Sequence, residues 1–227
     1  MKSLKFGVDD ELRYLGVFIY YGMAYGVVVE RGRVDIREHA RKLVNDLIRS
    51  YSIERVRELP IIRCYRNIML RLGIDPIKVR VSSEALLRRV LRSASFPHIN
   101  NVVDSCNLAS LETLIPISVF DLGKIAEGII KLRKARPKEL FVDIDGGIEL
   151  LKGNEIVLAI DDFILHVYPH RDSINASIDA NTKDVLTVAY GVQDVPKTLV
   201  RDAVSKVLKY LMMYCGARNT QGPYYVD

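Results

Sequence analysis

The sequence lacks most of the patterns that would assign a chemistry to it directly. It holds only three cysteines in 227 residues, widely spaced and without a C-x-x-C pair, so neither a disulfide framework nor a zinc site is predicted. It contains no glycine-rich phosphate loop, no H-E-x-x-H and no G-x-S-x-G. The sequence therefore indicates no metal and no cofactor.

A long apolar run is also missing. The longest, Leu15 to Val29, has 15 residues and is interrupted by glycines, whereas a membrane helix needs ~20 apolar residues. Asp9, Asp10 and Glu11 lie where a signal peptide would require an apolar segment. We therefore expect no membrane contact and a cytoplasmic location.

The composition is that of a folded, soluble chain. Hydrophobic residues make up 49% and charged residues 27%, and the length suffices for a sizeable core. The net charge of +5 permits an anionic partner. Basic residues gather locally at Lys78, Arg80, Arg88, Arg89 and Arg92. Such a run is commonly a solvated helix face, and the alternative is a surface that binds RNA phosphates.

The hydrophobic spacing predicts helices first and strands later. Helices are expected over 34–51, 60–73, from Ser82 onward, and over 196–216. Strands are expected over 17–21, 25–29, 129–133, 140–144, 155–160, 163–168 and 185–191, with a turn or bulge near 22–26 and a hairpin at Gly146-Gly147. Residues 217–227 are predicted to be a loose tail. This order favours an α+β fold.

One segment combines apolar residues with many short polar side chains. The polar residues are Asn100, Asn101, Asp104, Ser105 and Asn107. Because Asn and Asp disfavour helix interiors unless their side chains find partners, we expect residues 99–118 to line a polar pocket together with residues from 166–190. Asp104 and Asn107 could instead cap helix turns. Cys106 is either a small buried apolar residue or a nucleophile.

Several motifs carry a resemblance to a known family. Residues 99–113 read INNVVDSCNLASLET and residues 116–121 read PISVFD, which resemble the B3/B4 domain of the phenylalanyl-tRNA synthetase beta subunit. Freestanding proteins that consist of this domain alone are closer still, with matches at 82–92 (SSEALLRRVLR), 168–173 (YPHRDS) and 182–186 (TKDVL).

The resemblance covers roughly residues 60–216. It implies a β-sandwich-like core of unusual topology flanked by helices. Residues 1–59 would then be a strand-and-helix extension packed on this core.

The resemblance also implies an activity. In the synthetase this domain is the editing domain, which hydrolyses mischarged tyrosine from the tRNA. The family's Thr-Asn pair falls on Cys106 and Asn107, its histidine on Ser118, and the glutamate that meets the tyrosine hydroxyl on Val188. Since Val188 offers no hydrogen bond, we expect any activity to discriminate against tyrosine.

Other candidate residues follow the family motifs less directly. Arg171 and Asp172 lie in the Y-P-x-R-D-S match and are assigned to the site, with a local turn salt bridge as the alternative. His98, His166 and His170 are scattered along the sequence and are expected to be structural or to face solvent.

The sequence therefore predicts a freestanding domain that hydrolyses a mischarged aminoacyl-tRNA in trans. The motifs for ATP and amino-acid activation are missing, so a complete tRNA ligase is excluded. The alternatives are a non-catalytic binder of tRNA, another RNA or an amino-acid-like ligand, and a module that docks onto a synthetase.

Overall fold

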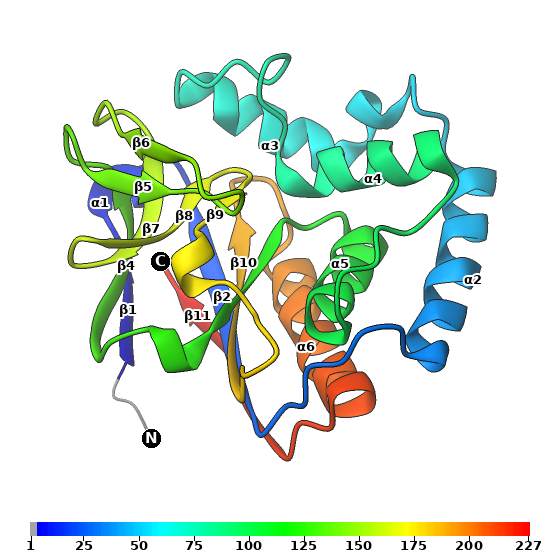
Figure 1. Ribbon diagram of the computed structural model, residues 1–227. Helices are drawn as coiled ribbons and strands as arrows, with labels where there is room; N and C mark the ends of the chain where they lie inside the picture. Colours follow the sequence, from blue (N-terminus) through cyan, green and yellow to red (C-terminus); the bar gives the residue numbers. More distant parts are fainter. Residues whose placement is uncertain (1–3) are drawn as a thin grey trace.

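Two β-sheets and a layer of helices are stacked on one another in the computed structural model, which describes residues 4–227 (Figure 1). The first sheet has the order β1 (Leu4–Val8), β4 (Gly128–Lys134), β7 (Ile156–Ile160), β8 (Phe163–Tyr168) and β9 (Arg171–Asp172). The second has the order β11 (Asn219–Val226), β2 (Phe18–Tyr25), β10 (Asp184–Gly191) and β3 (Ile117–Asp121). Aromatic contacts join their facing surfaces, including Phe6 stacked on Tyr21 with ring centroids 3.6 Å apart.

Helices cover the other face of the second sheet and one end of the sandwich. The helices are α1 (Asp10–Tyr14), α2 (Val34–Ser50), α3 (Pro60–Arg71), α4 (Ser82–Ser93), α5 (Asn101–Thr113) and α6 (Lys197–Cys215), with short 3-10 turns at Val56–Glu58, Leu122–Lys124 and Ile174–Ala176. α5 and α6 pack on the second sheet, and α3 and α4 lie together above the strands in Figure 1. The predicted helices are present with ends within two residues, and the α+β class with its sandwich-like core is confirmed.

The first part of the chain is integrated into the sheets. β2 pairs with β10 on one side and β11 on the other, so it lies inside the second sheet, and β1 pairs with β4 in the first. Residues 4–59 are therefore not a separate extension packed on a finished core. Without these residues, the part of the chain that carries the family motifs would lack β2, an inner strand of the second sheet.

Of the turn or bulge expected near 22–26, no turn interrupts β2, which runs to Tyr25 and ends at a bend at Gly26 with a φ of +73°, so the strand expected over 25–29 is not formed. Gly22 is required by packing instead. A Cβ atom there would lie 2.9 Å from Leu208 Cδ1 and 3.0 Å from the Gln221 carbonyl oxygen. Helix α6 and strand β11 can approach β2 this closely only where no side chain intervenes.

The tail predicted to be loose is also wrong. Residues 219–226 form β11, which pairs with β2 on both sides of a register shift between Gln221 and Tyr224. The shift accommodates Gly222-Pro223, the dipeptide that suggested a loose end. Packing of the Tyr225 ring against Tyr20, with centroids 5.2 Å apart, adds a side-chain reason for the strand to form.

A short hairpin projects from the first sheet. β5 (Leu140–Val142) and β6 (Ile148–Leu150) pair with each other only, around a turn in which Gly146 has a φ of +86°. This confirms the hairpin predicted at the glycine pair. Within residues 4–227, no helix is both long and apolar enough to cross a membrane.

Candidate functional site

The polar residues at the start of α5 hold the helix in place. The side chain of Asn100 caps α5 by accepting a hydrogen bond from the Val103 backbone N–H at 2.9 Å. Asp104 accepts from the Ile99 backbone N–H at 2.8 Å and lies 2.7 Å from His98 Nδ1. For Asn100 and Asp104 the structure therefore shows a capping role.

Two neighbouring residues on α5 differ in exposure. The thiol of Cys106 is buried and faces the Ile117 carbonyl oxygen at 3.4 Å. Burial, aided by the negative charge of Asp172, raises the pKa of the Cys106 thiol far above its usual value. The residue is therefore a small buried group and not a thiolate nucleophile. Asn107 is only partly buried.

A cluster of polar side chains lies where the two sheets meet. His166 on β8 is the centre: its Nδ1 is 2.8 Å from Asp172 Oδ1 and 3.5 Å from Ser118 Oγ. His166 and Ser118 are buried, while the Asp172 side chain is 41% exposed and connects the cluster to the surface. Tyr190 stacks on the imidazole with ring centroids 4.9 Å apart. Val188 pairs with Ser118 across the strands and shares its face of the sheet.

The Asp172 carboxylate fixes the tautomer of the neutral His166 imidazole. A carboxylate only accepts, so Nδ1 carries the hydrogen and Nε2 is left with its lone pair. Nε2 is buried and has no hydrogen-bond partner within residues 4–227. A serine nucleophile would have to face Nε2, whereas Ser118 faces Nδ1. The arrangement leaves Nε2 as a buried, unused proton acceptor and does not activate Ser118.

His166 was expected to be structural or to face solvent, and the sequence did not predict its cluster. Its partners come from three separate strands, and their register was not visible in the sequence. One signal was present: a histidine within the apolar strand 163–168 is followed six residues later by an aspartate, and the chain returns so that His166 and Asp172 pair directly.

Arg171 does not belong to this cluster. Its guanidinium pairs with Glu149 and lies 5.2 Å from the centre of the Phe141 ring, so it contacts the β5–β6 hairpin. Adjacent residues of a strand point to opposite faces, which separates Arg171 from Asp172.

The five basic residues predicted to bind RNA do come together. They line a hollow of about 280 Å³, which we call the basic concavity. Its lining residues are Lys78, Val79, Arg80, Ala85, Arg88, Arg89, Arg92 and His170. Arg88 is committed to structure, because it donates to Glu84 at 2.8 Å and to the Ile53 carbonyl oxygen at 2.9 Å. Burial and the charge of Arg171 lower the pKa of His170 to about 4, so the positive charge at neutral pH comes from lysine and arginine.

The basic concavity and the His166 cluster are close neighbours. His170 lines the former and Asp172 belongs to the latter, and two residues of extended chain span at most about 7 Å. No group of three His, Cys, Asp or Glu residues in the part of the chain described here could hold a metal ion.

Residues 64–216 match the B3/4 domain, so the chain belongs to the B3/4 domain family. It is 35% identical to the phenylalanine–tRNA ligase beta subunit of Fusobacterium nucleatum over 118 residues, which is 52% of this chain and 14% of that protein. The same subunit of Aquifex aeolicus is 30% identical over 122 residues, 54% of this chain and 15% of that protein. The chain thus spans about a seventh of the length of these relatives.

A solved structure is also similar. It is an N-terminal fragment of the phenylalanyl-tRNA synthetase beta subunit from Pyrococcus horikoshii, with a TM-score of 0.48 and 15% identity over 94% of this chain and 50% of the fragment.

Proposed function

We propose that this B3/4 domain hydrolyses a mischarged aminoacyl-tRNA in trans. One observation carries the proposal: the His166–Asp172 pair, with a free Nε2, lies next to a basic concavity suited to phosphates. The relatives are subunits of a tRNA ligase, which makes tRNA the anionic partner to expect. The basic concavity would hold the backbone of the acceptor end, and the ester would lie at the cluster.

In the proposed reaction His166 is the general base. Water attacks the ester carbonyl carbon while its proton passes to Nε2, and Asp172 stabilises the imidazolium that results. The bond from the carbonyl carbon to the ribose oxygen then breaks, and that oxygen takes the proton back. The products are the free amino acid and the uncharged tRNA.

The residues beside His166 suggest the class of amino acid. Val188 is fully buried and Ser118 is small, so that end of the site is narrow and offers little polarity. A buried phenol hydroxyl facing Val188 would be unsatisfied at a cost of about 1–3 kcal/mol. The substrate is therefore an ester of a small or apolar amino acid, and tyrosine esters should be cleaved more slowly.

The test is single-turnover deacylation of a panel of mischarged tRNAs. His166→Gln should slow cleavage of the best substrate by about 10²–10⁴-fold, because general base catalysis is lost. Asp172→Asn should slow it too while tRNA affinity is kept, and since Asp172 is partly exposed this variant guards against misfolding. His98→Gln is the matched control, because His98 pairs with Asp104 in the same way outside the cluster.

Cleavage by His166→Gln at the wild-type rate would exclude the mechanism. Tight tRNA binding with no cleavage of any ester would favour the alternative, a non-catalytic tRNA-binding module. The near-complete burial of His166 and Ser118 favours this alternative, because a buried base is not accessible to an ester.

A further inference from the structure

The positive charge of the molecule is concentrated in one segment. Residues 49–92 contain eleven Lys or Arg and four Asp or Glu, a net charge of +7, while the whole chain carries +5. The rest of the chain is therefore at −2. This segment forms the end of α2, the 3-10 turn Val56–Glu58, α3 and α4. The excess charge thus belongs to the helical end of the sandwich (Figure 1).

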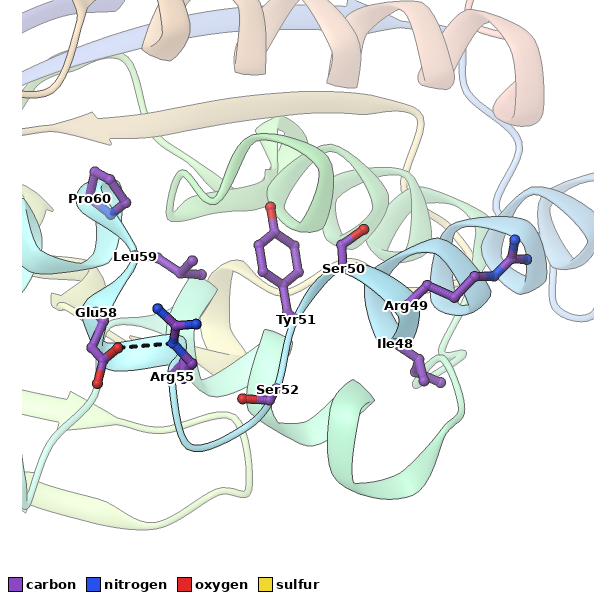
Figure 2. Close-up of a pocket in the computed structure, with 9 residues that line it drawn as sticks. All are labelled: Ile48, Arg49, Ser50, Tyr51, Ser52, Arg55, Glu58, Leu59 and Pro60. Atoms are coloured by element: carbon purple, nitrogen blue, oxygen red, sulfur yellow. Dashed lines mark hydrogen bonds and ion pairs between the residues drawn. The ribbon is translucent and has the colours of Figure 1, made fainter.

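Two hollows open on this segment. One is the basic concavity. The other, which we call the Tyr51 groove, has a volume of about 600 Å³ and is lined by Ile48, Arg49, Ser50, Tyr51, Ser52, Arg55, Glu58, Leu59 and Pro60. Figure 2 shows the Tyr51 ring in the middle of the groove, with Arg49 and Arg55 on opposite sides of it.

The arginines of the Tyr51 groove are available to a ligand. The Arg49 and Arg55 side chains are 76% and 79% exposed, and each makes one i,i+3 ion pair on the surface, with Asp46 and Glu58. Exposed pairs of this kind contribute only about 0–1 kcal/mol, so a phosphate can replace the carboxylate. Tyr51 adds an aromatic surface on which a base can stack.

The two hollows are joined by direct hydrogen bonds. Arg88 lines the basic concavity, and its Nη1 donates to the carbonyl oxygen of Ile53 in the loop between Tyr51 and Arg55. Arg66 donates to the Pro76 carbonyl oxygen, two residues before Lys78. Both arginines share the buried carboxylate of Glu84. The loops that carry the two hollows are therefore held in one fixed arrangement.

We infer that the Tyr51 groove and the basic concavity form one RNA-binding face, and that the groove contacts the tRNA beyond its aminoacyl end. The inference rests on the proposed function, which places the acceptor end in the basic concavity. With the acceptor end bound near His166, the Tyr51 groove is left to contact a more distant part of the same folded RNA. A single phosphate or nucleotide could fill one hollow but not both.

The experiment compares a full-length tRNA with a minihelix made of its acceptor stem, both as uncharged transcripts. The double variant Arg49→Ala/Arg55→Ala should bind the full tRNA about tenfold more weakly, and the slope of log affinity against log salt should fall by about 0.7–0.9 per lost contact. Its affinity for the minihelix should be unchanged. Arg89→Ala/Arg92→Ala should weaken both RNAs.

The matched control is Arg201→Ala/Lys209→Ala, which removes the same charge from exposed positions on α6. An equal loss in this control would mean that only net charge matters, and it would overturn the inference. So would an unchanged tRNA affinity in the groove variant, or an equal loss for tRNA and minihelix. Deacylation of a charged minihelix tests the proposed function separately, so the two can fail independently.

Discussion

At the scale of single residues, Glu84 stands out because it is fully buried and charged. Arg66 Nη1 donates to both of its carboxylate oxygens at 3.1 Å, and Arg88 Nε donates at 2.8 Å. The sequence places Glu84 in the first turn of a helix, where a carboxylate suits the dipole. The structure adds that it neutralises two arginines from different elements, whose side chains are 19% exposed.

Glu84→Gln should lower the free energy of unfolding by about 3 kcal/mol, because it leaves two partly buried cations without their counter-ion. Urea denaturation measures this. Glu58→Gln breaks the exposed pair with Arg55 and should cost less than about 1 kcal/mol. If the two substitutions cost the same, Glu84 does not hold the helical end together.

Only part of the candidate site could be predicted from the sequence. The basic concavity was predictable because its lysine and arginines lie within the fifteen positions 78–92 and their charge is evident from the sequence. The His166 cluster was not, since it depends on the register of β8 with β9 and on the contact between two sheets. For Asp104 the sequence leaves a pocket wall and a helix cap as alternatives, because a sequence shows a polar side chain but not the backbone group that it satisfies.

At the scale of elements, a buried ion pair links β4 to the start of β5. Arg133 donates through Nη1 and Nη2 to the two oxygens of Glu139, at 2.9 and 2.6 Å. Burial alone would raise the pKa of Glu139, but the hydrogen bonds from Arg133 and from the Arg136 backbone N–H outweigh it and hold the pKa below its ordinary value of 4.5. The pair therefore stabilises the fold only while Glu139 is ionised.

This pair makes stability depend on pH in a defined direction. A carboxyl with a lowered folded pKa contributes stability above its unfolded value, and the contribution is lost as the pH falls through the folded pKa. Glu139→Gln should thus be less stable than wild type at pH 7, and the difference should shrink below about pH 4.5. Urea midpoints across this range measure it. Asp162→Asn, at the exposed partner of Arg136, should show little effect at pH 7.

Helices and strands were predicted with different success. α2, α3, α4 and α6 follow from local spacing, and each is confirmed. β11 was missed because its partner β2 lies about 200 residues away, and its Gly-Pro pair looks like a break until the register shift is seen. A strand is defined by its neighbour, and a single sequence does not show which neighbour that is.

At the scale of the whole molecule, β11 closes the second sheet. Deleting residues 219–227 should remove the edge partner of β2 and expose its backbone groups. Each lost hydrogen bond is worth about 0.5–1.5 kcal/mol, so the free energy of unfolding should fall by about 3 kcal/mol or more. Thermal and urea denaturation measure this, and deletion of residue 227 alone, which lies outside β11, should change little. A truncated chain as stable as the full chain would show that the strand is dispensable.

The pairing of β2 with both β10 and β11 also has a kinetic consequence. Bringing such distant segments together costs loop-closure entropy before any stabilising contact forms, and topologies of this kind therefore fold slowly. The helical end, with its basic face, is built from neighbouring segments and can form early. The His166 cluster lies between two sheets that each combine segments from far apart in the chain. A folding chain should therefore acquire the surface proposed to attract RNA before it acquires the cluster proposed to act on it.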